Sequence, residues 1–234
     1  IRNRGVFGTK ASLSANDLVH LDLRDRYNNP EDLLSASITI NAMTLNYLLG
    51  DDTLGDEFLE FSSIEEPLVS LDQVVLKEDD KHRILSVVAR HEEKHACRAA
   101  WGFDERIRYG RGVLMLFYGV PGTGKTMTAH AIAEKLGKRV LNVDIPTFIE
   151  NREAGRFLPG LFREARLRNA VIFFDECETL FGDRRGGNVL MTTLLTELER
   201  FEGVAILATN LPENLDPALD RRILVKVRFP KPDR

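Results

Sequence analysis

The 234-residue chain lacks several features that mark particular classes of protein. It has only two cysteines, Cys97 and Cys177, which are too few for a disulfide framework. No apolar run reaches the roughly 18 residues that a membrane-spanning helix needs, and no signal-peptide pattern opens the sequence. The formal net charge of −4 gives no electrostatic basis for binding nucleic acid or an anionic membrane. These absences predict a cytoplasmic protein without a membrane or nucleic-acid partner.

The composition that is present is typical of a soluble globular domain, with 43% hydrophobic and 29% charged residues. The chain begins at Ile1 rather than methionine and stops at Arg234, shortly after a strand-like run. We therefore expect it to be a segment of a longer protein.

Residues 1–66 are polar and rich in turn signals, with short helical patterns near 31–36 and 41–49. This spacing predicts a small helical or winged-helix-like region, and a simple packing appendage fits the pattern equally well. The segment 62–67 has the composition of a linker. A longer amphipathic pattern predicts a helix over 79–101.

After Gly112, short apolar runs alternate with helical stretches. The runs occupy residues 113–118, 139–143, 171–174, 204–208 and 223–229. Apolar runs without polar alternation are typical of strands that are buried on both faces. Strand–helix alternation favours an α/β fold, with a parallel sheet flanked by helices, and we place this domain at 67–234.

The clearest motif is GVPGTGKT at residues 119–126, which fits the pattern G-x-x-x-x-G-K-[ST] between a hydrophobic strand and an amphipathic helix. Glycines allow positive φ angles and let backbone amides approach phosphates closely. Lys125 is placed to reach the β- and γ-phosphates, and the Thr126 hydroxyl to coordinate Mg²⁺. The predicted ATP-binding residues are Gly119, Val120, Pro121, Gly122, Thr123, Gly124, Lys125, Thr126, Met127 and Asp175.

An acidic pair ends the apolar run at 171–174, where Asp175 and Glu176 follow at the carboxyl end of a predicted buried strand. In open α/β sheets this edge faces the ligand crevice. We predict that Asp175 holds Mg²⁺ through its water shell, and that Glu176 orients and deprotonates the attacking water. The expected cofactor is Mg²⁺ bound with ATP.

These two motifs are followed by Ala208-Thr209-Asn210 and by the run LDPALDRR at residues 215–222. Over about 76–232, the ordered set resembles the AAA subgroup of AAA+ ATPases, which includes the katanin- and spastin-type remodelling enzymes. The resemblance implies a ring, expected to be a hexamer, that hydrolyses ATP and remodels a protein partner. It implies that Asn210 is sensor 1, contacting the γ-phosphate or the attacking water, and that Arg221 and Arg222 form the arginine-finger region that reaches the neighbouring subunit's nucleotide. Either arginine could be the finger.

The sequence departs from this family in two places. The segment 147–155 does not contain the usual aromatic–hydrophobic–glycine pore loop, and we expect Phe148 to pack beneath the loop rather than to grip a polypeptide. The helical lid and sensor 2 that follow the last strand in this family have no counterpart before Arg234.

Two other functions fit parts of the sequence. His91, Glu92 and His95 match H-E-x-x-H on a predicted helix, which would make the protein an ATP-dependent zinc protease. No third zinc ligand follows at a suitable spacing, so we favour two histidines on a solvated helix face, and a zinc measurement distinguishes the two. A nucleotide-gated assembly module with little turnover is the other alternative, against which the Asp175–Glu176 pair argues.

Overall fold

A computed structural model describes residues 19–22, 37–40, 45, 48–49, 55, 58–101, 112–151, 154–182 and 189–231. The chain divides into two compact units, Ile1–Gly55 and Asp56–Arg234.

In the first unit, β1 (Val19–Asp22) pairs with β2 (Ser37–Ile40) in antiparallel register, with Val19 opposite Ile40. The sequence did not predict these strands. The helical pattern expected near 31–36 lies outside the described residues, as does most of the one near 41–49.

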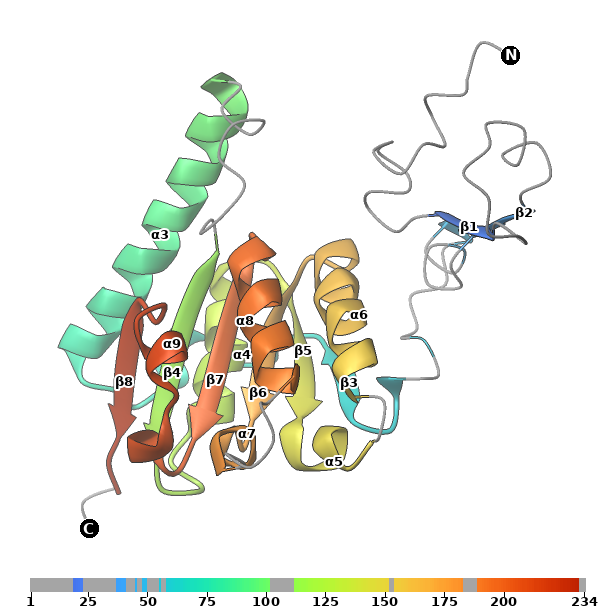
Figure 1. Ribbon diagram of the computed structural model, residues 1–234. Helices are drawn as coiled ribbons and strands as arrows, with labels where there is room; N and C mark the ends of the chain where they lie inside the picture. The colour runs from blue at the N-terminus through green and yellow to red at the C-terminus, as the bar shows by residue number, and fades with distance from the viewer. Residues whose placement is uncertain are drawn as a thin grey trace. The chain divides into compact units, whose positions relative to one another are not determined.

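The second unit is built on a six-stranded sheet with the order β3-β5-β6-β7-β4-β8 (Figure 1). Its strands are β3 (Ser62–Glu65), β4 (Val113–Gly119), β5 (Arg139–Asp144), β6 (Ala170–Asp175), β7 (Val204–Thr209) and β8 (Val225–Phe229). The last five strands are parallel to one another, and β3 is antiparallel to β5. All five strands that the sequence predicted are confirmed, and so is the parallel α/β architecture.

The prediction of a linker at 62–67 is wrong, because Ser62–Glu65 form the edge strand β3. The pairing places Ser62 opposite Val143, and just beyond the strand Arg139 Nε donates to Glu66 Oε1 at 2.6 Å. Only two of the four residues of β3 are even partly shielded from solvent, so the strand is polar and has little apolar signal of its own. Pairing with β5 and the burial of neighbouring phenylalanines stabilise it instead.

Helices cover both faces of the sheet. They are α3 (Glu78–Trp101), α4 (Lys125–Lys135), α5 (Ile145–Glu150), α6 (Ala154–Leu167), α7 (Glu178–Gly182), α8 (Val189–Arg200) and α9 (Pro217–Asp220), with short 3-10 turns η4 (Leu71–Gln73) and η6 (Pro212–Asn214). In Figure 1, α6 and α8 lie in front of the sheet and α4 lies behind it. The helix predicted over 79–101 is confirmed as α3. Among the described helices, none has both the length and the apolar character needed to cross a bilayer.

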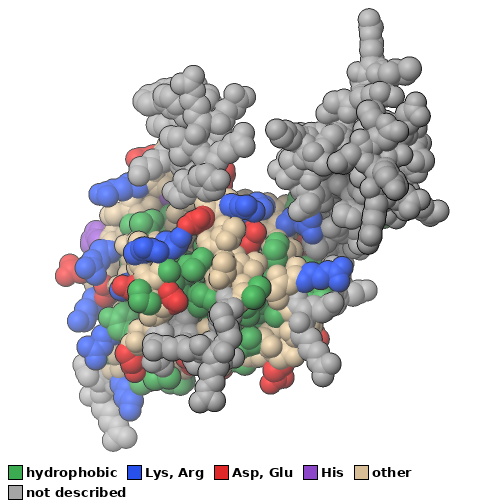
Figure 2. All heavy atoms as spheres, in the orientation of Figure 1, with side chains coloured by type: hydrophobic (Ala, Val, Ile, Leu, Met, Phe, Trp, Pro, Cys, Tyr) green, Lys and Arg blue, Asp and Glu red, His purple; other side chains and the backbone are tan. Residues whose placement is uncertain are grey.

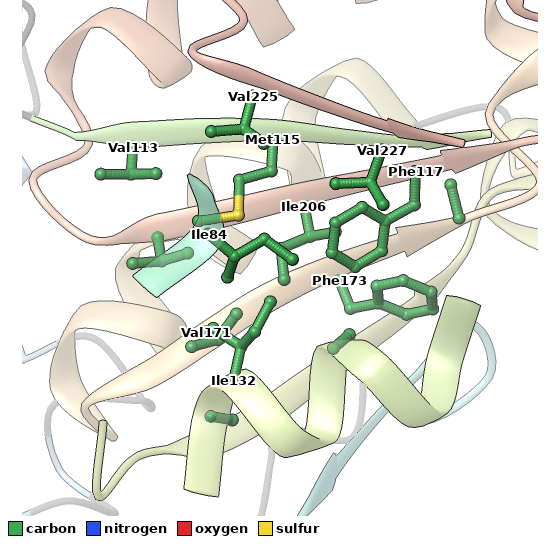
Figure 3. Packing of buried hydrophobic residues seen from close by; sticks show 14 of the residues in the cluster. Ile84, Val113, Met115, Phe117, Ile132, Val171, Phe173, Ile206, Val225 and Val227 are labelled. Atoms are coloured by element: carbon green, nitrogen blue, oxygen red, sulfur yellow. The ribbon is translucent and has the colours of Figure 1, made fainter. Parts of the chain in front are cut away.

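The core between α4 and the sheet explains why α4 lies where it does. Met115 of β4, Val171 of β6 and Ile206 of β7 are all fully buried on the face that α3 and α4 cover. Figure 3 shows Ile84 of α3 beside Met115, and Ile132 of α4 beside Val171. Because side chains alternate between the two faces of a strand, the intervening residues face the other side of the sheet, where Phe174 of β6 packs against Phe162 of α6 with ring centroids 5.8 Å apart. The phosphate loop that leads into α4 therefore starts from the end of a buried strand.

Phe148 on α5 lies in an aromatic cluster. Its side chain is 1% exposed, and its ring centroid lies 5.0 Å from that of Phe61. Phe61 also contacts Phe58 and Phe157, at 6.1 Å in each case. The expected packing role of Phe148 is confirmed, and a buried ring is not available to grip a polypeptide.

Replacing Phe61 with alanine should lower the free energy of unfolding by about 3–5 kcal/mol, because it leaves a cavity where β3 is anchored to α5 and α6. Urea unfolding of Phe61→Ala and of the original chain measures this difference. Leu59→Ala is the matched control, since Leu59 is 56% exposed, and it should cost less than about 0.5 kcal/mol. Equal losses for the two variants would contradict the anchoring role of Phe61.

Positive and negative side chains are interspersed over the described part of the face in Figure 2, where lysine and arginine alternate with aspartate and glutamate. Hydrophobic side chains lie between them in small groups.

Candidate functional site

The motifs meet at one edge of the sheet. β4, β6 and β7 are neighbouring parallel strands, so their carboxyl ends lie together at the lower edge in Figure 1. The phosphate loop follows β4, the acidic pair ends β6, and Asn210 follows β7. A crevice at this edge is the usual ligand position in open α/β sheets.

The phosphate loop owes its shape to its glycines. Gly119, Gly122 and Gly124 have φ angles of 147°, 73° and 96°, which lie in the region that favours glycine. At Gly119 a Cβ would lie 2.1 Å from the carbonyl oxygen of Phe229, so only glycine lets the end of β4 approach β8 this closely. α4 begins directly after Gly124, which has no side chain to cap the first amides of the helix. These amides are suited to binding an anion.

Lys125 is held inward at the start of α4. Its side chain is largely buried, and its Nζ donates to the carbonyl oxygens of Gly119 at 2.7 Å and Val120 at 3.1 Å. The third bond runs to Asn210 Oδ1 at 2.9 Å. The structure thus brings together two residues that the sequence assigned to the same nucleotide from motifs far apart.

Burial and nearby carboxylates have opposite effects on the pKa of Lys125. Burial lowers the pKa of Lys125, and the carboxylates of Asp175, Glu178 and Glu176 act in the opposite direction. Burial likewise raises the pKa of Asp175, against the effects of its hydrogen bond from the Glu176 amide and of the Lys125 charge. A bound polyanion would compensate the positive charge of Lys125, and a bound Mg²⁺ would compensate the negative charge of Asp175.

The acidic pair lies at a sharp turn. Asp175 ends β6 and its Oδ1 accepts from the Glu176 amide at 2.9 Å. Glu176 is exposed and has a φ of 53°, which is rare for a residue with a side chain and costs on the order of 1–3 kcal/mol. The Cys177 amide donates to the Ala208 carbonyl at 2.9 Å and so holds the turn against β7. Such strain is concentrated at functional sites, and here it directs Glu176 away from the core.

Thr126 and Asp175 are the residues that could hold Mg²⁺. The Thr126 side chain is exposed and Asp175 is half-buried. A hydroxyl and a carboxylate are the hard oxygen ligands that Mg²⁺ uses, and Mg²⁺ keeps several waters when it binds phosphates. The donor set fits the metal.

Sequence reasoning missed one residue of the site, Glu178 in the first turn of α7. Its carboxylate accepts from Thr209 Oγ1 at 3.0 Å, from the Asn210 amide at 3.2 Å and from Asn210 Nδ2 at 2.8 Å. Burial acts to raise the pKa of Glu178, but hydrogen bonds from its own backbone, Asn210 and Thr209 outweigh burial, and the pKa is lowered. The sequence could have indicated Glu178, because it is a third acidic residue only two positions after Glu176.

The two arginines at the end of α9 differ in their surroundings. Arg222 forms an ion pair with Glu199 of α8, and its Nη1 donates to the Ala218 carbonyl at 2.5 Å. Arg221 is exposed.

The H-E-x-x-H segment lies on α3, so His91 and His95 are one helical turn apart. The side chains of Glu92 and His95 lie outside the described residues. Among those that are described, no group of three or more histidine, cysteine, aspartate or glutamate residues could hold a metal ion.

Comparison with known families gives two matches. Residues 115–231 match the model of the ATPase family associated with various cellular activities (AAA). Residues 1–62 match a variant of the winged helix domain. The second match agrees with the winged-helix-like alternative expected for the N-terminal region.

Curated relatives agree with the first match. The chain is 37% identical over 144 residues to a cell division cycle protein 48 homolog of Archaeoglobus fulgidus, covering 55% of this chain and 19% of that protein. It is 37% identical over 140 residues to 26S proteasome regulatory subunit 7 of Dictyostelium discoideum, covering 53% and 32%. A proteasome-associated ATPase of Acidothermus cellulolyticus is 28% identical over 226 residues, covering 79% and 38%. The chain therefore spans well under half the length of these relatives.

Solved structures share the fold. The crystal structure of the FIGL-1 AAA domain aligns with a TM-score of 0.56 and 23% identity, covering 75% of this chain and 59% of that one. The same domain in complex with ADP aligns with a TM-score of 0.57, again at 23% identity, covering 77% and 64%.

Proposed function

Because this chain belongs to the AAA family of ATPases, we propose that it binds ATP with Mg²⁺ at the edge formed by β4, β6 and β7 and hydrolyses it. One observation carries the proposal. Lys125 Nζ and Asn210 Oδ1 are 2.9 Å apart, at the edge of the sheet where Asp175 ends the neighbouring strand β6 and Glu176 follows it. A cation, an amide and two acids at the mouth of a glycine-rich loop are the groups that phosphoryl transfer to water requires.

Each residue has a proposed part in the reaction. The amides at the start of α4 bind phosphate oxygens, and Lys125 binds the β- and γ-phosphates. Thr126 and Asp175 would hold Mg²⁺, which when bound neutralises charge on the phosphates. Glu176 accepts a proton from the attacking water as the water oxygen bonds to the γ-phosphorus and the bond to the bridging oxygen breaks.

The assembly follows from the same assignment. We propose a ring, a hexamer by family resemblance, in which Arg221 reaches the nucleotide of the next subunit. Arg221 is the preferred finger because it is exposed, whereas the guanidinium of Arg222 pairs with Glu199 and Ala218 of its own subunit. Two relatives are named for their association with the proteasome, which supports a protein partner as the substrate of remodelling. We do not assign Phe148 a part in threading a polypeptide, because its ring is buried.

The N-terminal region is proposed to be a separate winged-helix-like domain that precedes the ATPase domain. The family match to residues 1–62 supports this assignment. We expected the boundary after residue 66, whereas the compact units divide after Gly55 and β3 belongs to the sheet.

Lys125→Ala should weaken binding of Mg·ATP by about a hundredfold, because it removes charge-assisted hydrogen bonds to the phosphates. Isothermal calorimetry measures the affinity, and steady-state phosphate release measures hydrolysis. Lys135→Ala is the matched control, since Lys135 is an exposed lysine at the other end of α4. If the original chain binds Mg·ATP but releases no phosphate, it is a nucleotide-gated assembly module; if it does not bind, the site assignment fails.

A further inference from the structure

We propose that Glu178 is a positioning residue, which fixes the orientation of the Asn210 carboxamide and through it the ammonium group of Lys125. The inference rests on the proposed ATPase function, and it assigns a role to a carboxylate that the acidic pair does not include. Glu178 begins α7, whereas Asn210 follows β7, so the contact crosses from one strand end to the next.

Both oxygens of the Glu178 carboxylate are used. Oε2 accepts from the Thr209 hydroxyl at 3.0 Å and from the Asn210 backbone amide at 3.2 Å. Oε1 accepts from Asn210 Nδ2 at 2.8 Å. Two of these three bonds come from Asn210, so the carboxylate holds this residue by its backbone and its side chain together.

Only one orientation of the Asn210 carboxamide satisfies its two neighbours. A carboxylate can only accept hydrogen bonds, and an ammonium group can only donate them. The Asn210 amide group must therefore face Glu178, and its Oδ1 must face Lys125, as the distances of 2.8 Å and 2.9 Å show. The two charged groups define the orientation independently of one another.

This orientation determines what happens when a triphosphate enters. Within the described part of the chain, three oxygens accept from Lys125 Nζ; two are backbone carbonyls, whereas the one from Asn210 belongs to a side chain. A phosphate oxygen can replace it without displacing the backbone of the loop. Asn210 then remains bound to Glu178, and its second Nδ2 hydrogen is available to the γ-phosphate or to the attacking water.

Glu178→Gln tests the orientation directly, because glutamine has nearly the same shape but only one accepting oxygen. If that oxygen serves Thr209 and the Asn210 backbone, the glutamine amide faces Asn210 Nδ2. The Asn210 carboxamide must then turn over. In the nucleotide-free site this places a second donor against the Lys125 ammonium, and in the nucleotide-bound site it moves Nδ2 out of the position from which it would reach the γ-phosphate or the attacking water. We expect kcat to fall about tenfold or more, with the Kd for Mg·ATP changed less than about threefold. Glu178→Asp keeps the charge on a shorter side chain and should recover part of kcat.

The experiment is a double-mutant cycle on the full chain. Phosphate release and Mg·ATP calorimetry are measured for Glu178→Gln, Asn210→Ala and the combination, with Glu213→Gln as an exposed matched control. If Glu178 acts through Asn210, Glu178→Gln causes no further loss of kcat once Asn210 is alanine. Equal losses in both backgrounds, or a loss in Glu213→Gln as large as that in Glu178→Gln, would overturn the proposal.

A readout without turnover separates this inference from the proposed function. In isotope-labelled, nucleotide-free protein, the side-chain amide resonances of Asn210 should move in Glu178→Gln and stay in place in Glu213→Gln. If the original chain releases no phosphate, the ATPase proposal fails and these resonances decide the positioning role. Unchanged resonances in Glu178→Gln would reject it.

Discussion

Replacing Arg221 with alanine should lower the rate of ATP hydrolysis by about 10³–10⁵-fold, while Mg·ATP still binds. A guanidinium that reaches the transferring phosphoryl group stabilises charge that is largest in the transition state, so its loss affects kcat more than affinity. Phosphate release is measured at protein concentrations at which the original chain assembles. Sedimentation of each variant at the same concentration shows whether assembly itself is retained.

Arg222→Ala is the matched comparison. Because Arg222 is bound to Glu199 and Ala218 within its own subunit, we expect its loss to alter the packing of α9 on α8 and to reduce hydrolysis much less than loss of Arg221. A larger effect for Arg222 than for Arg221 would reverse the assignment.

Mixing two inactive variants tests whether the arginine acts between subunits. Lys125→Ala retains Arg221 but binds nucleotide poorly, and Arg221→Ala retains an intact phosphate loop. In mixed assemblies, some sites combine an intact loop with an intact arginine from the neighbour, so activity should reappear. No recovery in assemblies shown to be mixed would contradict a finger supplied in trans.

Glu176→Gln should reduce hydrolysis by about 10²–10⁴-fold, because the amide cannot take a proton from water. The affinity for Mg·ATP should change by less than a factor of about three, since Glu176 acts on the attacking water in the transition state rather than on the bound nucleotide. Calorimetry and phosphate release on the same preparation measure the two effects separately.

Glu134→Gln provides the control for this substitution, because Glu134 is an exposed carboxylate on α4. It removes the same charge from the chain and should leave hydrolysis unchanged. Normal turnover by Glu176→Gln would mean that another group activates the water.

Much of the candidate nucleotide site could be predicted from local sequence. The order of glycines around Lys125 dictates a backbone with positive φ at the loop and a helix directly after it. The apolar run before Asp175 predicts a buried strand, and a strand of a parallel sheet ends at the ligand edge. These inferences need only the spacing of a few adjacent residues, so no distant contact has to be known.

Other features depend on contacts between distant residues. β3 is a strand because β5 pairs with it and because Phe61 is buried beside Phe148, although its own residues are mostly polar. Arg222 is distinguished from its exposed neighbour Arg221 by an ion pair with Glu199, 23 positions earlier in the chain.

The sequence by itself therefore determined the strand–helix alternation, the phosphate loop and the acidic pair, since each is encoded by residue types at short spacing. Only the tertiary structure decided that Glu178 belongs to the site and that Asn210 links it to Lys125, because residues 85 positions apart meet there. The physical reason is that backbone conformation follows from local sterics and hydrophobic pattern. The partner of a hydrogen bond across neighbouring strands depends on how the whole sheet packs.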